Sequence, residues 1–309
     1  WGSDPHGVVN VAPLPPGITY AAVAAGAWHA LGLRSDGRIE SWGDTSMGQA
    51  NVPALPAGVS YTAIAATWHS LALRSDGQVV AWGRNDHGQC NVPALPPGLA
   101  YVQVAAGQIH SVALRSDGRV ITWGDDLSFE GQLPELVPTD DFVDVATGGG
   151  HAIAVTASGE LVHWGATTHG LGQVPTLPAN VRYVACEAGL VHSIALCSDG
   201  TMRGWGNNQY GQSTIPPLPS GVTYTAATCG QFHTVALRSD GGAVAFGSNT
   251  WGECNVPTLP PGERYVDIAA APRVSLLLRS DGVVVGIGDN SDGRLSVPSL
   301  PTGVRFIQI

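Results

Sequence analysis

HSLALRSDGQVVAWG, residues 69–83, decides the fold of this 309-residue chain. Leu71 and Leu73 alternate with small residues, and the alternation resumes after Ser75-Asp76-Gly77, which indicates two half-buried strands. Serine, aspartate and glycine in a row favour a tight turn, because glycine readily adopts the positive φ that such turns need. The stretch therefore predicts a β-hairpin that ends at Trp82-Gly83.

The hairpin occurs seven times along the chain. When the copies are aligned on their turn glycine, at positions 37, 77, 118, 159, 200, 241 and 282, the spacing is 40 residues once and 41 residues five times. A fixed period of this size, with several short strands per unit, indicates the blades of a β-propeller. We therefore predict an all-β fold, in which residues 1–309 form a single β-propeller domain of seven repeats plus a terminal half-repeat.

Each repeat supplies four predicted strands. The first begins at an aromatic residue such as Tyr101, the hairpin forms the second and third, and the fourth ends in proline, as in Asn91-Val92-Pro93. Proline fixes φ and lacks a donor, so it suits an outermost strand and a stiff crossover to the next blade. Seven hairpins predict seven four-stranded blades. Eight first strands and eight fourth strands leave, as the alternative, a ring of eight in which one blade lacks its hairpin.

Composition and motifs argue against several classes of function. The net charge of −10 disfavours nucleic acid and anionic membrane as partners, and the chain has no apolar run long enough to span a membrane. Five cysteines at irregular spacing match neither a disulfide framework nor a zinc site. The chain also lacks the G-x-S-x-G, H-E-x-x-H and phosphate-loop motifs. We therefore expect no catalytic residues, no cofactor and no enzyme activity.

A histidine recurs at the start of the second strand in six repeats. These residues are His29, His69, His110, His151, His192 and His233, and Val274 takes the position in the seventh. Equivalent points on different blades lie too far apart for ligands that coordinate one metal ion with bonds of about 2 Å. We interpret the histidines as hydrogen-bonded core groups, because buried polar groups find partners.

Two loops in each repeat break the pattern. One precedes the histidine and the other follows the Trp-Gly pair, and up-and-down connectivity places both at the same end of the blade. Aromatic residues anchor protein interfaces and charges steer the partner. We therefore predict a partner-binding face made of Trp28, Trp68, Asp86, His87, Asp125, Asp126, Phe129, Tyr210, Phe232, Trp251, Arg273 and Asp289. The alternative for Trp28 and Trp68 is that they cap the central channel.

The repeat at residues 107–124, GQIHSVALRSDGRVITWG, resembles the repeat of the regulator of chromosome condensation family. The residues that carry the resemblance are Gly107, His110, Ala113, Leu114, Gly118, Trp123 and Gly124. The resemblance implies a seven-bladed propeller. The short unit and its Val-Pro linker are most similar to compact bacterial members, among them secreted β-lactamase-inhibitory proteins. It does not imply a chromatin role, because the chain lacks the expected insertions and a basic tail.

These observations favour a non-catalytic, monomeric module that binds a protein partner through one loop face. The resemblance implies a secreted enzyme inhibitor, with a class A β-lactamase as its partner. The alternative is a propeller that binds carbohydrate or a cell surface. Repeated sugar sites would show the same aromatic and polar pair in every blade, whereas the loop residues here differ from blade to blade.

Overall fold

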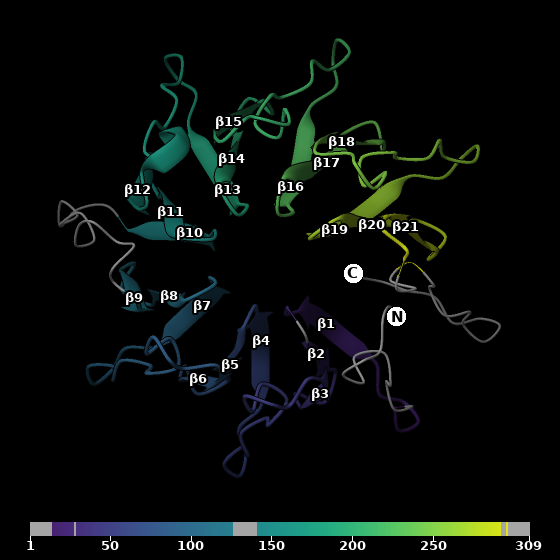
Figure 1. The fold of residues 1–309 in the computed structure, drawn as a ribbon. Helices are drawn as coiled ribbons and strands as arrows, with labels where there is room; N and C mark the ends of the chain where they lie inside the picture. Colours follow the sequence, from purple (N-terminus) through teal and green to yellow (C-terminus); the bar gives the residue numbers. More distant parts are fainter. Residues whose placement is uncertain (1–13, 28, 126–140, 292–294, 296–309) are drawn as a thin grey trace.

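The structure, a computed structural model, describes residues 14–27, 29–125, 141–291 and 295. In these residues, β-strands form seven three-stranded antiparallel sheets, joined by loops and one short 3-10 helix, η1 (Thr168–Gly170). The sheets are arranged radially, with the first strand of each facing the centre (Figure 1). No helix in this part of the chain is long and apolar enough to cross a membrane. The all-β prediction is confirmed.

We number the sheets first to seventh in chain order. Their inner strands are β1 (Tyr20–Ala25), β4 (Tyr61–Ala66), β7 (Tyr101–Ala106), β10 (Phe142–Thr147), β13 (Tyr183–Ala188), β16 (Tyr224–Cys229) and β19 (Tyr265–Ala271). Their middle strands are β2 (His29–Arg34), β5 (His69–Arg74), β8 (His110–Arg115), β11 (His151–Thr156), β14 (His192–Cys197), β17 (His233–Arg238) and β20 (Val274–Arg279). Their outer strands are β3 (Ile39–Gly43), β6 (Val79–Gly83), β9 (Val120–Gly124), β12 (Leu161–Gly165), β15 (Met202–Gly206), β18 (Ala243–Gly247) and β21 (Val284–Gly288).

The hairpin predicted at residues 69–83 is formed by β5 and β6. The turn between them needs glycine, since Gly77 has a φ of +76°. Asp76 accepts a hydrogen bond from the backbone N–H of Gln78 at 3.2 Å and pairs with Arg74. The Asp76 side chain therefore stabilises the turn, as the sequence indicates.

The fourth strand of each blade is the feature that differs from the prediction. Segments such as Asn91-Val92-Pro93 are described but are not paired as strands. Val92 donates its N–H to the carbonyl of Cys90 at 3.0 Å, and Pro93 has no N–H to give. The Pro93 carbonyl accepts a hydrogen bond from the Tyr101 hydroxyl at 3.0 Å, so the segment is fixed to the next sheet instead. The terminal half-repeat lies outside the described residues, and the count of seven blades rather than eight stays a prediction.

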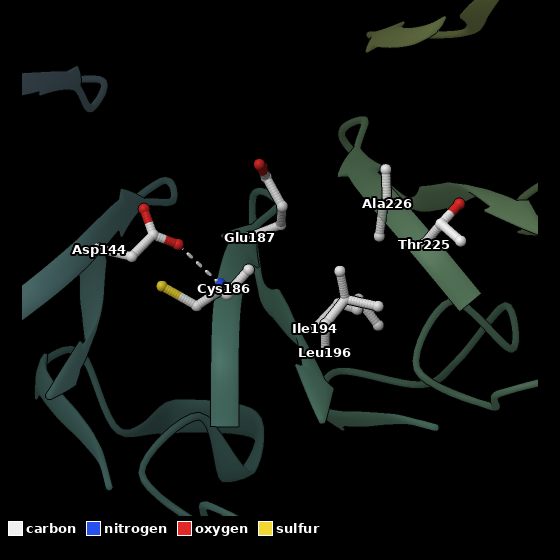
Figure 2. Close-up of a pocket in the computed structure, with 9 residues that line it drawn as sticks. Asp144, Cys186, Glu187, Ile194, Leu196, Thr225 and Ala226 are labelled. Carbon is white, nitrogen blue, oxygen red and sulfur yellow. Dashed lines mark hydrogen bonds between the residues drawn. The ribbon is translucent and has the colours of Figure 1, made fainter. Parts of the chain in front are cut away.

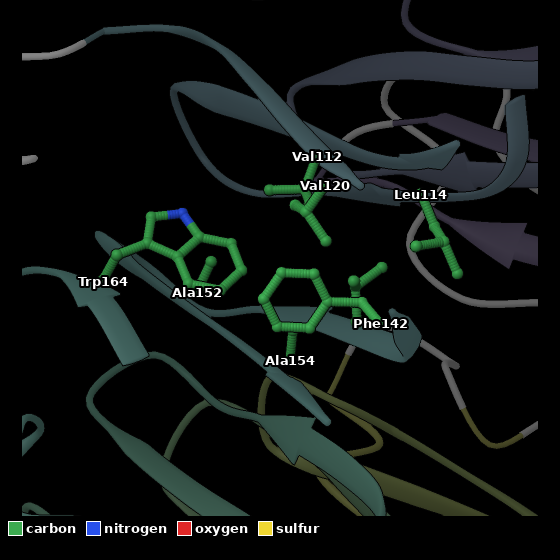
Figure 3. Packing of buried hydrophobic residues seen from close by; sticks show 8 residues of the cluster. Val112, Leu114, Val120, Phe142, Ala152, Ala154 and Trp164 are labelled. Carbon is green, nitrogen blue, oxygen red and sulfur yellow. The ribbon is translucent and has the colours of Figure 1, made fainter. Parts of the chain in front are cut away.

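The core lies between neighbouring sheets rather than within them. Val112 and Leu114 of the third sheet pack with Phe142, Ala154 and Trp164 of the fourth, and all five are buried (Figure 3). A single three-stranded sheet has no second layer of its own to cover these faces. Stacking against a neighbour therefore supplies the hydrophobic stabilisation, as in other repeat architectures.

The repeated histidines join adjacent sheets. His69 Nε2 lies 2.7 Å from Ser111 Oγ of the third sheet, and Ser111 donates its hydroxyl proton to the Gln89 carbonyl at 2.8 Å. Because that proton is already donated, His69 must donate from Nε2. The Trp123 indole N–H bonds the same carbonyl at 2.8 Å. The corresponding pairs are His29–Ser70, His151–Ser193, His192–Thr234 and His233–Ser275, with separations of 2.8, 2.8, 3.0 and 2.9 Å.

Burial keeps these imidazoles neutral. It lowers the pKa of His69 to about 4 and that of His151 to about 3, because the charged form loses its hydration. In the described part of the chain, no three His, Cys, Asp or Glu side chains are grouped so as to hold a metal ion. The structure agrees with the interpretation of the histidines as hydrogen-bonded core groups.

Candidate functional site

The two variable loops of each sheet meet at one end of that sheet. In the second sheet, His69 of β5 pairs with Gly83 of β6, so Trp68, just before β5, and Arg84, just after β6, lie at the same end of the sheet. In the sixth sheet the first residue of the later loop is tied directly to the earlier one, because Ser248 donates its N–H to the Phe232 carbonyl at 2.8 Å. We call the residues of these loops the loop face.

Aromatic contacts on the loop face cross from one sheet to the next. Tyr210, at the tip of the loop after β15, lies against Phe232, which precedes β17, with ring centroids 5.7 Å apart. Trp251, at the matching tip after β18, lies under the guanidinium of Arg273, which precedes β20, at 5.1 Å. Tyr210 and Trp251 are 49% and 46% exposed, which is unusual for large aromatic side chains. The fifth, sixth and seventh sheets therefore share one continuous set of contacts.

A second set of contacts lies on the second and third sheets. The Arg84 guanidinium lies 5.6 Å from the centre of the half-buried Trp68 ring and pairs with Asp86 at 2.7 Å. The hydrogen bonds from Arg84 lower the pKa of Asp86 to about 2, so this exposed carboxylate is ionised. His87 Nδ1 lies 2.9 Å from Asp125 Oδ2, which joins the loops after β6 and β9.

Two predicted acids are buried rather than exposed. The Asp125 side chain is 9% exposed, and the Asp289 residue is 4% exposed. Asp289 Oδ1 accepts hydrogen bonds from the N–H and the hydroxyl of Ser291 at 2.9 and 2.6 Å. Asp289 Oδ2 is 3.8 Å from Arg273. These buried acids are placed to position their neighbours, and the side chains of His87 and Arg273 that they contact are the more exposed members of the two pairs.

The structure places nine of the twelve predicted residues on the loop face. Trp28, Asp126 and Phe129 lie outside the described residues. The other nine form two groups, within which the contacts above occur. One group is Trp68, Asp86, His87 and Asp125, and the other is Tyr210, Phe232, Trp251, Arg273 and Asp289.

Sequence reasoning missed a buried polar residue that supports the loop tip in several sheets. Gln89 Oε1 accepts the N–H of His87 at 2.9 Å, and Gln212 Oε1 accepts the N–H of Tyr210 at 3.0 Å. In the sixth sheet Glu253 takes this place and accepts the N–H of Trp251 at 2.8 Å. The signal was the Gly-Gln pair that follows this loop in several repeats, as in Gly88-Gln89 and Gly211-Gln212, and that becomes Gly252-Glu253 in the sixth. These side chains hold the tips in one conformation before any ligand binds.

A cavity of about 290 Å³ opens beside Trp251. It is lined by Gln231, Phe232, His233, Ser248, Trp251, Glu253 and Arg273. Both carboxylate oxygens of Glu253 are occupied, because Ser248 donates its hydroxyl to Oε1 at 2.8 Å and Trp251 donates its N–H to Oε2. The cavity combines aromatic walls with one exposed cation, Arg273.

A second cavity, of about 220 Å³, lies at the inner edges of β10, β13 and β16 (Figure 2). Asp144 and Glu187 line it, and sequence reasoning singled out neither. Asp144 is held by the N–H of Cys186 at 3.0 Å and by the amide of Gln103 at 3.0 Å. Desolvation, and to a lesser extent the charge of Asp144, raises the pKa of Glu187 to about 8. Small residues of β16, such as Ala226, leave this space open.

Comparison with known proteins now places the chain in a family. The profile of the Regulator of chromosome condensation (RCC1) repeat matches residues 20–49, 67–89, 101–132, 142–171, 181–212 and 224–253, which together span more than half of the chain. The chain belongs to the RCC1 repeat family. The RCC1 profile does not include the seventh sheet, where Val274 and Ile287 replace the usual histidine and tryptophan.

Solved structures show the same fold. Prp20p from Saccharomyces cerevisiae is 20% identical, with a TM-score of 0.68 over 94% of this chain and 91% of that one. Human WBSCR16 is 19% identical, with a TM-score of 0.67 over 84% of this chain and 87% of its own. The CRINKLY WD40 ectodomain of the Arabidopsis thaliana receptor kinase ACR4 is 19% identical, with a TM-score of 0.63 over 89% of this chain and 98% of the ectodomain. No curated protein sequence matches the chain. Because these three structures are only 19–20% identical to the chain, their similarity to it concerns the fold alone.

Proposed function

We propose that this chain is a non-catalytic, monomeric propeller that binds one protein partner on its loop face. The observation that carries the proposal is that the scaffold repeats while the loop face does not. The position before the second strand holds Trp68, Ile109, Val191, Phe232 and Arg273 in five of the sheets. An irregular surface on a regular scaffold suits one asymmetric ligand.

The physical character of the loop face supports a protein partner. Tyr210 and Trp251 offer exposed aromatic surface, and aromatic residues are enriched among those that contribute most to protein interfaces. Their tips are held by buried Gln212 and Glu253, so little conformational entropy is lost on binding. Prp20p, which shares the fold, binds Gsp1p and histones. That likeness supports protein binding in general and names no partner for this chain.

A capture experiment tests the proposal. Immobilised chain carrying Trp68→Ala, Tyr210→Ala and Trp251→Ala is compared with wild type, using fluid from the natural surroundings of the protein. The matched control carries Gln78→Ala, Arg119→Ala and Val283→Ala, which replace exposed residues after turns at the opposite end of the sheets. We expect wild type and control to retain the same protein and the loop-face variant to lose it. Equal retention by all three would contradict the proposal.

For the partner itself, we propose a class A β-lactamase, with the chain acting as a secreted inhibitor. The support is the short repeat and Val-Pro linker, which resemble those of compact secreted bacterial inhibitors. Titration of the chain against several class A enzymes tests this directly. We expect inhibition in the nanomolar range, whereas no inhibition at micromolar protein would reject the inhibitor role and leave protein binding intact. Fractionation of the producing cells tests secretion.

Carbohydrate binding is the competing outcome. Equivalent sugar sites would repeat one aromatic residue and one polar partner in each sheet, but Ile109, Val191 and Arg273 stand where Trp68 and Phe232 stand elsewhere. A glycan array with wild type and the loop-face variant separates the two functions. Specific glycan binding that the variant loses would favour the carbohydrate function.

A further inference from the structure

Arg273 stands at a backbone position that disfavours it. β19 and β20 remain paired up to Ala271 and Val274, so Pro272 and Arg273 form a two-residue turn. Arg273 has a φ of +67°. A turn with proline first and positive φ second favours glycine or asparagine at the second place, because a side chain there is strained. A strained residue on a loop is a reason to look for function.

The surroundings hold the Arg273 guanidinium without using its donors. It lies over the Trp251 ring at 5.1 Å and 3.8 Å from Asp289 Oδ2, which is longer than a hydrogen bond. Its side chain is 53% exposed. Among the described residues, no acceptor receives a hydrogen bond from the guanidinium. The group is therefore oriented, charged and available.

The cavity beneath Arg273 presents one accessible charge. Glu253 is 1% exposed and Asp289 4% exposed, and hydrogen bonds occupy both oxygens of Glu253. His233 also lines the cavity, and burial lowers its pKa, which favours the neutral imidazole. Because both acids are buried and Arg273 is exposed, an incoming group meets the cation and the aromatic walls.

We infer that the cavity between Phe232, Trp251 and Arg273 is a carboxylate-recognition subsite of the loop face. It would take the side chain of an acidic residue, or the C-terminal carboxylate, of the partner. Planar guanidinium binds carboxylate with two parallel hydrogen bonds, and the methylene groups of the ligand pack on Trp251 and Phe232. The inference rests on the proposed function, since it names the partner group that this part of the face recognises.

Nuclear magnetic resonance titrations of the isotope-labelled full chain test the subsite. The probes are acetyl-Leu-Glu-Leu-amide, its Gln and Lys counterparts, and acetyl-Leu-Leu with a free C-terminus. We expect the Glu peptide or the free C-terminus to shift the Trp251 indole N–H and Arg273 Nε–H signals, with Kd on the order of millimolar. Comparing those two probes shows which carboxylate the subsite takes. The Gln and Lys peptides should leave both signals unchanged.

Arg273→Gly is the decisive variant, because glycine suits the positive φ and folding is not compromised. We expect Arg273→Gly to weaken carboxylate binding at least tenfold on the Trp251 signal, and Arg273→Lys to weaken it less. Arg119→Ala, which removes a cation at the opposite end of the sheets, should change nothing. Binding by the Gln or Lys peptide as strong as by Glu would overturn the inference. So would full binding by Arg273→Gly, or no shift at about 10 mM carboxylate probe.

The two proposals fail separately. If the probes do not bind but the loop-face variant still loses the captured protein, the subsite is rejected and the protein-binding function stands. If the probes bind and wild type captures no protein that the variant loses, the subsite stands and the protein-binding function is rejected.

Discussion

Residues at equivalent positions serve the scaffold in most sheets, and His69 shows how. Its Nε2 donates to Ser111, Ser111 donates to the Gln89 carbonyl, and the Trp123 indole donates to the same oxygen. The group of bonds spans two sheets and is fully buried at His69 and Ser111. These residues therefore recur because the packing of adjacent sheets requires them, and our proposal assigns partner binding to the residues that break the repeat.

Ser111→Ala tests this bonded group. The substitution leaves the buried His69 Nε2–H without its acceptor, so we expect the free energy of unfolding to fall by about 1–3 kcal/mol. Urea unfolding at pH 7 measures it. Ser220→Ala, at an exposed position between sheets, should stay within about 0.5 kcal/mol of wild type. An equally small effect of Ser111→Ala would show that the bond is dispensable.

The histidines also predict acid sensitivity. Their folded pKa lies near 4 for His29, His69 and His192 and near 3 for His110 and His151, below the ordinary value of 6.5. A lowered pKa means that the unfolded chain takes up protons first. The stability that the buried neutral histidines contribute is therefore complete above pH 6.5 and falls as the pH decreases below 6.5. For each histidine, the free energy of unfolding falls by up to about 1.4 kcal/mol per pH unit.

His69→Gln separates this effect from other acid titrations. Glutamine retains an N–H donor for Ser111 but does not titrate, so the slope of unfolding free energy between pH 6.5 and 5 should fall by about one proton. Urea unfolding at several pH values in this window provides the slope. A slope identical to that of wild type would mean that His69 is not held neutral by the fold.

At the scale of the strand and turn, the close approach of successive repeats makes particular glycines necessary. Gly77 and Gly98 both have positive φ, of +76° and +83°. A Cβ added at Gly77 would lie 2.4 Å from the Ala100 Cβ, whereas one at Gly98 meets nothing within 4 Å. Alanine substitutions at the two positions therefore separate the cost of backbone strain from the cost of a steric clash.

Gly98→Ala should cost about 1 kcal/mol through backbone strain alone. Gly77→Ala should cost clearly more, because the next sheet must shift to make room. Thermal unfolding of both variants beside wild type gives the comparison. Equal losses would indicate that the turn of one repeat is not packed against the start of the next.

The inner strands carry a further test, at Glu187. Its folded pKa of about 8 lies above the ordinary 4.5, so the fold favours the neutral acid. The stability it contributes is present below pH 4.5 and is lost as the pH rises through 8. Glu187→Gln should therefore raise the melting temperature at pH 9 and change it little at pH 4.5. Glu160→Gln, at an exposed position, should show no such difference.

Strands were predictable from the sequence to different degrees. The hairpin at residues 69–83 follows from alternation and a turn signal, both of which are local. The outer segment at Asn91-Val92-Pro93 has strand-like residues, but whether its backbone pairs depends on donors that Pro93 lacks and on the Tyr101 hydroxyl that binds it. Likewise, Asp125 and Asp289 look like exposed loop acids until the neighbouring loops are placed, and only the three-dimensional structure shows that they are buried.

At the scale of the whole molecule, the seven described sheets share one radial scaffold and carry an irregular loop face. Contacts from Tyr210 to Phe232 and from Trp251 to Arg273 cross sheet boundaries, so the loop face is assembled only when neighbouring sheets pack. The repeat profile matches the scaffold of six sheets, and the fold neighbours share that scaffold at about 20% identity. Family membership therefore accounts for the shared scaffold, whereas the loop-face residues differ from sheet to sheet.

Hydrogen–deuterium exchange of the complex with the captured protein would locate the surface of the propeller that binds it. We predict slower exchange on binding in peptides that contain Trp68, Tyr210, Phe232 and Trp251. Exchange should be unchanged in the turns at Gln78 and Val283, at the opposite end of the sheets. Protection of those turns, with unchanged exchange on the loop face, would show that the partner binds the opposite end of the sheets.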